Sequence, residues 1–198
     1  MIQVPIMKTG FTPVPICAAL SRRRTAKEDL MRIATCLTAL ALIGCAHADT
    51  PAPALDQDML APIDLSTPEA TAYSMMRAMY QGDASMIDAI FLDGAQLRRV
   101  TGDGEIRPDG LQRWRSWVDT LEVGQAHEEL FAVTSEQFGH LATVWAPFVI
   151  SVDGARVGCG VNTLTLAQVD QNWHVVFAMD TGEPAETCGD FEDRYTAD

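Results

Sequence analysis

The sequence predicts an α+β fold, in which helices in the first half of the domain pack on a strongly curved antiparallel sheet from the second half. Residues 139–183 hold three long segments of strand character, separated by Asp153-Gly154 and Asp170-Gln171-Asn172, which are turn sequences typical of β-hairpins. Residues 67–92 carry apolar side chains at steps of three and four residues, the period of an amphipathic helix. Helices followed by a run of strands indicate the α+β class.

Two helices begin the domain. Ser66-Thr67-Pro68-Glu69 supplies a hydroxyl cap, a proline in the first turn and an acidic residue after the cap. The first helix then has one apolar stripe and ends at Gly82, and Asp83 caps the second helix. The stripe consists of Ala72, Met75, Met76, Met79 and Tyr80.

The remaining elements alternate with clear turn signals. A short strand is predicted over residues 96–101, and Pro108-Asp109 opens a third helix that reaches Leu121. The next strand is predicted over 127–135 and is turned by residues 136–139. The three long strands follow at 140–151, 155–168 and 173–181.

The N-terminal residues predict export to the bacterial periplasm or the outer membrane. From Met31 the chain has one arginine, an apolar run over 33–44 and then small residues, a secretory signal too short for a permanent membrane anchor. Ala46-His47-Ala48 fits cleavage before Asp49, whereas Leu42-Ile43-Gly44-Cys45 fits a lipoprotein signal that would acylate Cys45. The sequence leaves open which of these two processed forms is made. It also leaves open which methionine begins translation, with Met31 favoured over Met1.

These signals divide the chain into four parts. Residues 1–48 are the extension and signal, of which 1–30 would be absent if Met31 is the start. Residues 49–65, rich in Pro and Ala, are predicted to be a flexible linker. The folded domain is predicted over 66–182, and residues 183–198 form an acidic tail.

Charge and cysteine content restrict the partners and the compartment. Residues 49–198 hold 8 Arg, no Lys and 25 Asp and Glu, a formal charge of −17 that opposes binding to nucleic acid or anionic lipid. Cys159 and Cys188 remain after the signal, and an even pair in an oxidising compartment predicts a disulfide, with two separate thiols as the alternative. His127, His140 and His174 lie on separate predicted strands, so neither a metal site nor a cofactor is expected.

Residues 139–183 resemble the nuclear transport factor 2-like (SnoaL-like) superfamily. The resemblance lies in the successive short motifs VWAPF, DG, CGVNTLTL, W-VV and DT. The segment is most similar to small bacterial members of the lumazine-binding-like or uncharacterised type, and the likeness extends over residues 67–182. The resemblance implies a cone-shaped α+β fold with a cavity between the helices and the sheet. It also implies that members range from isomerases, dehydratases and hydrolases to proteins that only bind or form homodimers.

Two polar residues on neighbouring predicted strands are the first candidates for a site in that cavity. If Val169 lies opposite Trp173, then Asn162 faces Asp180 directly among apolar neighbours. Burial would raise the pKa of such a carboxyl, which would suit Asp180 to acid–base work. A structural hydrogen bond at the end of the sheet is the alternative.

Further candidates for ligand contact come from the aromatic, methionine and arginine residues. Aromatic rings offer stacking surfaces, methionines form an adaptable apolar wall, and an inward arginine would bind an acidic group. Ordinary packing or surface ion pairing is the alternative for each of them. These candidates are Trp145, Tyr73, Tyr80, Met79 and Arg98.

The sequence thus predicts an exported domain that binds a small, largely apolar ligand in its cone without catalysis. One alternative is an interaction or homodimerisation module that uses the open face of the sheet. The other is an isomerase, dehydratase or hydrolase with Asp180 as its acid or base.

Overall fold

The computed structural model describes residues 55–196 and has the predicted α+β architecture. The predicted signal, both of its processing sites and Cys45 lie outside the described residues. The elements are η1 (Asp58–Leu60), α1 (Pro68–Gln81), α2 (Ala84–Ile90), β1 (Phe91–Val100), α3 (Leu111–Val118), β2 (Ala126–Leu130), β3 (Thr134–Phe138), β4 (Leu141–Val152), β5 (Ala155–Val169), β6 (Asn172–Thr181), β7 (Glu183–Pro184), η2 (Ala185–Thr187) and α4 (Asp193–Thr196).

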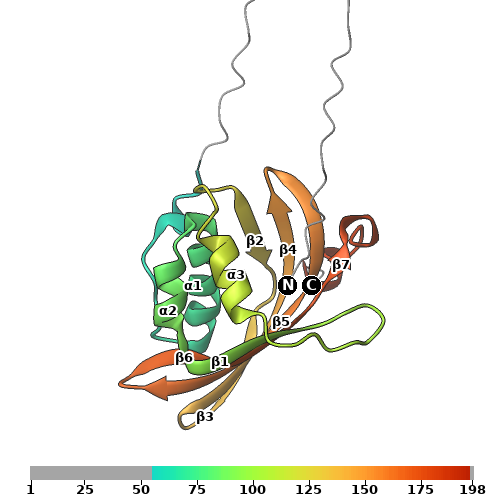
Figure 1. The fold of residues 1–198 in the computed structure, drawn as a ribbon. Helices are drawn as coiled ribbons and strands as arrows, with labels where there is room; N and C mark the ends of the chain where they lie inside the picture. The colour runs from blue at the N-terminus through green and yellow to red at the C-terminus, as the bar shows by residue number, and fades with distance from the viewer. Residues whose placement is uncertain (1–54, 197–198) are drawn as a thin grey trace, which may run out of the picture. The chain divides into compact units, whose positions relative to one another are not determined.

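The strands form one mixed sheet with the order β1-β6-β5-β4-β2, in which β3 also pairs with β4 and β7 with β5. β1 runs parallel to β6, and the other pairs are antiparallel. Figure 1 shows α1, α2 and α3 on one side of this curved sheet. We call that side the inner face, which carries Val144, Phe148 and Leu164, and the opposite side the outer face.

The helices begin and end where local chemistry dictates. Thr67, rather than Ser66, caps α1 by accepting a hydrogen bond from the backbone N–H of Ala70, and the helix ends at Gly82 with a φ of 66°. Asp83 caps α2 through the backbone N–H of Ser85. The predicted stripe of α1 is buried against the sheet, in a core that includes Met75, Met76 and Met79. The core therefore lies between the helices and the inner face.

The segment predicted as one strand over 127–135 consists of two strands, β2 and β3, with a break between Leu130 and Thr134. Both pair with β4, and the break lies beside Pro147, whose carbonyl oxygen accepts a hydrogen bond from the N–H of Phe131. In an antiparallel ladder the N–H and C=O of one residue point to the same side. Pro147 has no N–H to offer on that side, so the pairing is interrupted there. The turn likewise lies at residues 139–140 and not at 136–139.

A disulfide between Cys159 and Cys188, as predicted, ties the C-terminal segment to β5. Both cysteines are buried beside Val149, and Phe131 and Phe191 pack against them. This small cluster covers one end of the outer face.

Residues 55–65, assigned to the linker by their composition, lie against α1. Leu65 accepts a hydrogen bond from the backbone N–H of Trp173, and Ser74 bonds with the backbone of Asp64. Gln81 donates to the carbonyl oxygens of Met59 and Ala61. These contacts supply partners for a backbone that no strand or helix satisfies, so the packed region begins before residue 66.

Candidate functional site

Asn162 on β5 and Asp180 on β6 lie directly opposite each other on the inner face. Both residues are buried, although most of their neighbours on this face are apolar. Arg99 on β1 is the next partner in the same row, because it lies opposite Asp180 on the other side of β6. Three adjacent strands thus bring three polar side chains together.

The pairing arises by a different register from the one predicted. Val169 lies opposite Asn172 and not opposite Trp173. This change of partner, by itself, would have shifted the whole β5–β6 pairing by one residue. Val176 has no partner, because Thr165 pairs with Phe177 and Leu166 with Val175. This β-bulge restores the pairing of Asn162 with Asp180.

The bulge also changes which side chains of β6 lie on the same face. Regular strand alternation over 173–181 would place Trp173, Val175, Phe177 and Met179 on one face. In the structure Trp173 and Val175 are buried together with Ala178, whereas Phe177 and Met179 are only half-buried. One extra residue reverses the alternation of every side chain beyond it.

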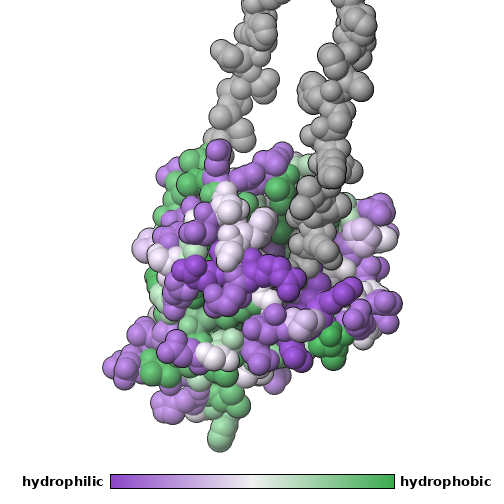
Figure 2. Space-filling view, viewed as in Figure 1, coloured by the Kyte–Doolittle hydropathy of each residue, from purple (hydrophilic) through white to green (hydrophobic). Residues whose placement is uncertain are grey.

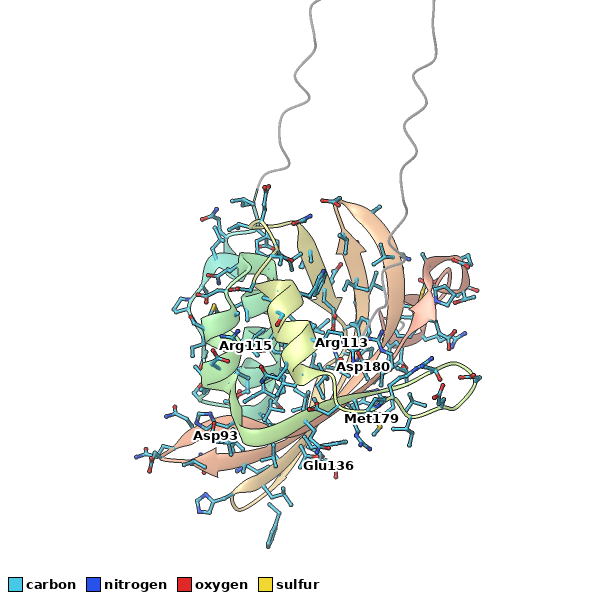
Figure 3. The ribbon with its side chains drawn as sticks, in the orientation of Figure 1. Asp93, Arg113, Arg115, Glu136, Met179 and Asp180 are labelled. Atoms are coloured by element: carbon cyan, nitrogen blue, oxygen red, sulfur yellow. A yellow bond between two sulfur atoms is a disulfide. The ribbon has the colours of Figure 1, made fainter. Side chains whose placement is uncertain are left out.

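Arg99 and Asp180 form a two-pronged ion pair. Arg99 donates from Nε to Oδ1 of Asp180 at 2.8 Å, and its Nη2 bonds with Oδ2. The side chains are only 11% and 10% exposed. Arg98, the predicted candidate, lies opposite Met179 on the other side of the strand, and its Nε is buried without a hydrogen-bond partner. Arg99 is therefore the arginine of the inner site. Met179 and Asp180, which follow each other near the end of β6, are labelled in Figure 3.

Glu128 on β2 completes the cluster and was not predicted. Asn162 donates from Nδ2 to its Oε1 at 2.5 Å. Burial raises the pKa of Glu128 to about 7, the Asn162 hydrogen bond lowers it, the charge of Asp180 raises it and Arg99 lowers it. Its side chain is nevertheless half-buried and keeps some accessible surface. We call Glu128, Asn162, Asp180 and Arg99 the inner polar cluster.

This cluster combines two chemical abilities. The ion pair of Arg99 with Asp180 holds both side chains in a fixed, two-pronged geometry. Glu128 exchanges its proton near neutral pH, so it can donate or accept a hydrogen bond depending on the pH. A group that titrates in this range fits either acid–base chemistry or binding that is linked to a proton.

The pattern around Glu128 contained a usable signal. Ala126 and Leu130 flank it at steps of two, and both belong to or pack on the core, so strand alternation turns Glu128 inward and Glu129 outward. The longer predicted strand, which began at His127, obscured this alternation.

The other predicted candidates do not join the cluster. Tyr73 is 41% exposed on α1, and Met79 is buried in the core. Tyr80 is buried, accepts a hydrogen bond from the backbone N–H of Asp56 and contacts the ring of His127 edge-on. Trp145 lies on the outer face and is 48% exposed. The described residues contain no group of three or more His, Cys, Asp or Glu that would hold a metal ion.

The outer face has a shallow groove of about 260 Å³ around Trp145. Arg98, Met179, Thr163, Trp145 and Thr134 form one row of paired residues across five strands. Figure 2 shows a mostly hydrophilic surface with a green hydrophobic tip at the bottom of the view, where the β3–β4 hairpin carries Phe138 and Leu141, 92% and 55% exposed. The groove is lined by Thr134, Ser135, Glu136, Thr143, Val144, Trp145, Thr163, Leu164 and Thr165.

Comparison with known proteins gives likeness in fold alone. No family model matches the chain, and no curated protein sequence matches it.

Among the helices of residues 55–196, none has the length and apolar character needed to cross a membrane.

Solved structures that the protein resembles in fold include nuclear transport factor 2-like proteins. The sequence motifs of residues 139–183 resemble the same superfamily. One is a proposed dehydratase from Streptomyces avermitilis, with 16% identity, 62% of this chain and 97% of that chain covered, and a TM-score of 0.49. Another, of unknown function, is from Shewanella baltica, with 14% identity, 58% and 90% coverage, and a TM-score of 0.45. A Nostoc punctiforme protein with a cystatin-like fold, also of unknown function, has 14% identity, 59% and 89% coverage, and a TM-score of 0.48.

Proposed function

We propose that this protein is an exported domain that binds a small, largely apolar molecule beside the inner polar cluster. The observation that carries the proposal is the convergence of four polar side chains from four strands on an apolar face. Burying charged groups costs free energy, and a buried ion pair is often no more stable than an apolar substitute. A cluster of this kind is better explained by a ligand than by stability.

The surroundings favour a ligand whose body is apolar. Leu130 and Phe148 lie opposite each other next to Glu128 on the inner face. Met75, Met76 and Met79 supply flexible, polarisable side chains to the same core. Export rests on the N-terminal signal and is part of the proposal.

Native mass spectrometry of protein purified from its host tests this proposal. We expect the wild type to retain an added mass that Asn162→Leu loses, because Asn162 orients Glu128. The control is Asn172→Leu, since Asn172 is exposed at the first residue of β6. Empty wild-type protein, or equal retention by both variants, would contradict ligand binding at this cluster.

Self-association through the outer face is a second candidate. Arg98 and Glu136 lie on the strands at opposite edges of the face, and a two-fold axis near β5 would bring each against the other residue of a partner. The partner would supply a carboxylate near the buried Nε of Arg98. Light scattering should then give twice the monomer mass, reduced by Trp145→Ser but not by Tyr73→Ser on α1. A monomeric wild type at high concentration would exclude this candidate.

Acid–base catalysis of the isomerase, dehydratase or hydrolase kind is the third candidate, and it is favoured by the ionisation of Glu128 near neutral pH. Glu128 replaces Asp180 as the proposed acid or base, because Asp180 is held by Arg99. The test is deuterium exchange into carbonyl compounds in D2O. Exchange that persists in Glu128→Gln would remove Glu128 from this role.

A further inference from the structure

The groove on the outer face combines an aromatic ring with polar side chains and lies apart from the inner polar cluster. It has a volume of about 260 Å³ and crosses β3, β4 and β5. Two rows of paired residues run across these strands. One row is Glu136, Thr143 and Thr165, and the other is Thr134, Trp145 and Thr163.

Most polar side chains of the groove have no partner within the protein. Thr163 is the exception, because its hydroxyl donates to a backbone carbonyl oxygen of β6 at 3.0 Å. Within residues 55–196, the hydroxyls of Thr134, Thr143 and Thr165 form no hydrogen bond. The carboxylate of Glu136 likewise has neither a hydrogen bond nor an ion pair there. A ligand that displaces water from these groups has to offer hydrogen-bonding groups in return.

Trp145 lies among these polar groups with 48% of its surface exposed. Its neighbours across the strands are Thr134 and Thr163, whose side chains are too small to cover an indole ring. The face of such a ring is negatively polarised, so it attracts aliphatic C–H groups and also removes them from water. The groove therefore suits a molecule with C–H groups on one side and hydroxyl groups around its rim.

The charge of the groove opposes an anionic ligand. Glu136 is the one charged side chain among the described residues that line it, and residues 49–198 carry a formal charge of −17. Arg98 lies in the row of Trp145 but beyond Met179, and it does not line the groove. The centres of protein interfaces are depleted in charged residues, so the unpaired Glu136 also argues against a second protein surface here.

We infer that the groove binds a neutral saccharide, with one sugar ring stacked on Trp145. Trp145 and Thr143 are two residues apart on β4, which places their side chains on the same face about 7 Å apart. Thr165 lies directly opposite Thr143, about 5 Å away. The ring hydroxyls thus reach Thr143, Thr165 and the carboxylate of Glu136, which accepts hydrogen bonds.

This site goes beyond the proposed binding at the inner polar cluster, because the two lie on opposite faces of the sheet. Either can fail while the other holds. Self-association through the outer face is different, since it would cover Trp145 and exclude the saccharide.

NMR titration of the ¹⁵N-labelled protein tests the inference with three neutral probes: maltotriose, cellotriose and N,N′,N″-triacetylchitotriose. We expect at least one of them to shift the indole N–H signal of Trp145 and the amides of Thr143 and Thr165 in a saturable way. Trp145→Ala should weaken this binding about tenfold, because the stacked surface is lost. Tyr73→Ala is the matched control, since Tyr73 is an aromatic residue 41% exposed on α1, and it should bind like the wild type.

A second variant separates hydrogen bonding from simple apolar contact. Thr143→Val removes one exposed hydroxyl but keeps the shape of the side chain and its preference for strands. We expect it to weaken saccharide binding about two- to tenfold, the usual effect of one lost hydrogen bond. Equal or tighter binding by Thr143→Val would show that the hydroxyl does not hold the ligand.

Three further results would overturn the inference. If none of the three probes binds to folded wild-type protein, the groove is not a site for neutral saccharides. If trigalacturonate binds as tightly as the neutral probes, the ligand class is wrong. If light scattering finds a dimer that Trp145→Ala dissociates, and the probes leave the Trp145 signal unchanged, the outer face is a protein interface instead.

Discussion

Glu128 is a carboxyl group whose ionisation is opposed by its own surroundings. Burial is the largest cause, and the charge of Asp180 adds to it, so the pKa rises to about 7. A glutamate in an unfolded chain ionises near 4.5. The folded state thus holds the proton more tightly than the unfolded state does.

This difference predicts how Glu128 changes stability with pH. A raised folded-state pKa stabilises the protein fully below about pH 4.5, and the contribution is lost as the pH rises through about 7. Relative to Glu128→Gln, the wild type should therefore lose free energy of unfolding between pH 5 and pH 8. Urea denaturation at both pH values measures this, with Glu129→Gln as the control. An identical loss in wild type and Glu128→Gln would contradict the raised pKa.

Arg99 predicts a larger effect, because its removal leaves Asp180 as a buried charge. Breaking a buried ion pair by removing one partner costs about 3–5 kcal/mol. We expect Arg99→Gln to lower the free energy of unfolding by about this amount, with much of the loss restored when Asp180→Asn is added. Arg98→Gln, one position along on the outer side, should cost much less. Equal losses for the two arginines, measured by urea denaturation, would show that the pair does not act as described.

At the scale of the elements, close packing between β5 and the end of β6 requires glycine. A Cβ atom at Gly160 would lie 2.2 Å from the carbonyl oxygen of Thr181 and 2.9 Å from Cζ of Phe148. The first of these is backbone and cannot rotate away.

Gly160→Ala should therefore destabilise the protein by about 1–3 kcal/mol, the usual cost of forcing extra volume into a packed region. Gly189→Ala is the matched control, since nothing lies within 4 Å of its Cβ position. Thermal unfolding of both variants measures the difference. If Gly160→Ala unfolds at the temperature of the control, the strands are not packed this closely.

The elements also show which features a sequence reveals. Asp153-Gly154 and Asp170-Gln171 marked both hairpins correctly because these turn sequences accept left-handed conformations, and all four residues have positive φ angles, from 49° to 73°. The bulge at Val176 gave no such sign, since an unpaired valine looks like any strand residue. The break beside Pro147 was also hidden, because the sequence does not show which neighbouring strand meets the missing N–H of Pro147. Only the pairing of the strands decides this.

The same distinction applies to the site. Asn162 and Asp180 were predicted as a pair because both interrupt apolar strands, and the structure places them opposite each other. Glu128 and Arg99 were missed because each stands beside a residue of the same charge, Glu129 and Arg98. Only the register decides which member of each pair turns inward.

At the scale of the whole molecule, the disulfide joins the C-terminal segment to the sheet. Cys159 and Cys188 are separated by 29 residues in the sequence. Closing a loop of that length stabilises a protein by about 3–4 kcal/mol in the chain-entropy model. Reduction should lower the free energy of unfolding by about this amount, measured by urea denaturation with and without dithiothreitol.

Cys159→Ser with Cys188→Ser supplies the control for reduction, because dithiothreitol should not change the stability of this double variant. An unchanged midpoint for reduced wild-type protein would show that the bond adds nothing to the stability of the fold.

The parallel pairing of β1 with β6 determines when the inner polar cluster forms during folding. Arg99 and Asp180 are 81 residues apart, whereas hairpins such as β4–β5 need only a few residues to close. Closing a long loop costs more entropy, so we expect β1 to join the sheet after the hairpins have formed. Pulse-labelling hydrogen exchange should find the amides of β1 protected last. A folding intermediate would then contain most of the sheet but no Arg99–Asp180 pair, so ligand binding would begin only when the chain has finished folding.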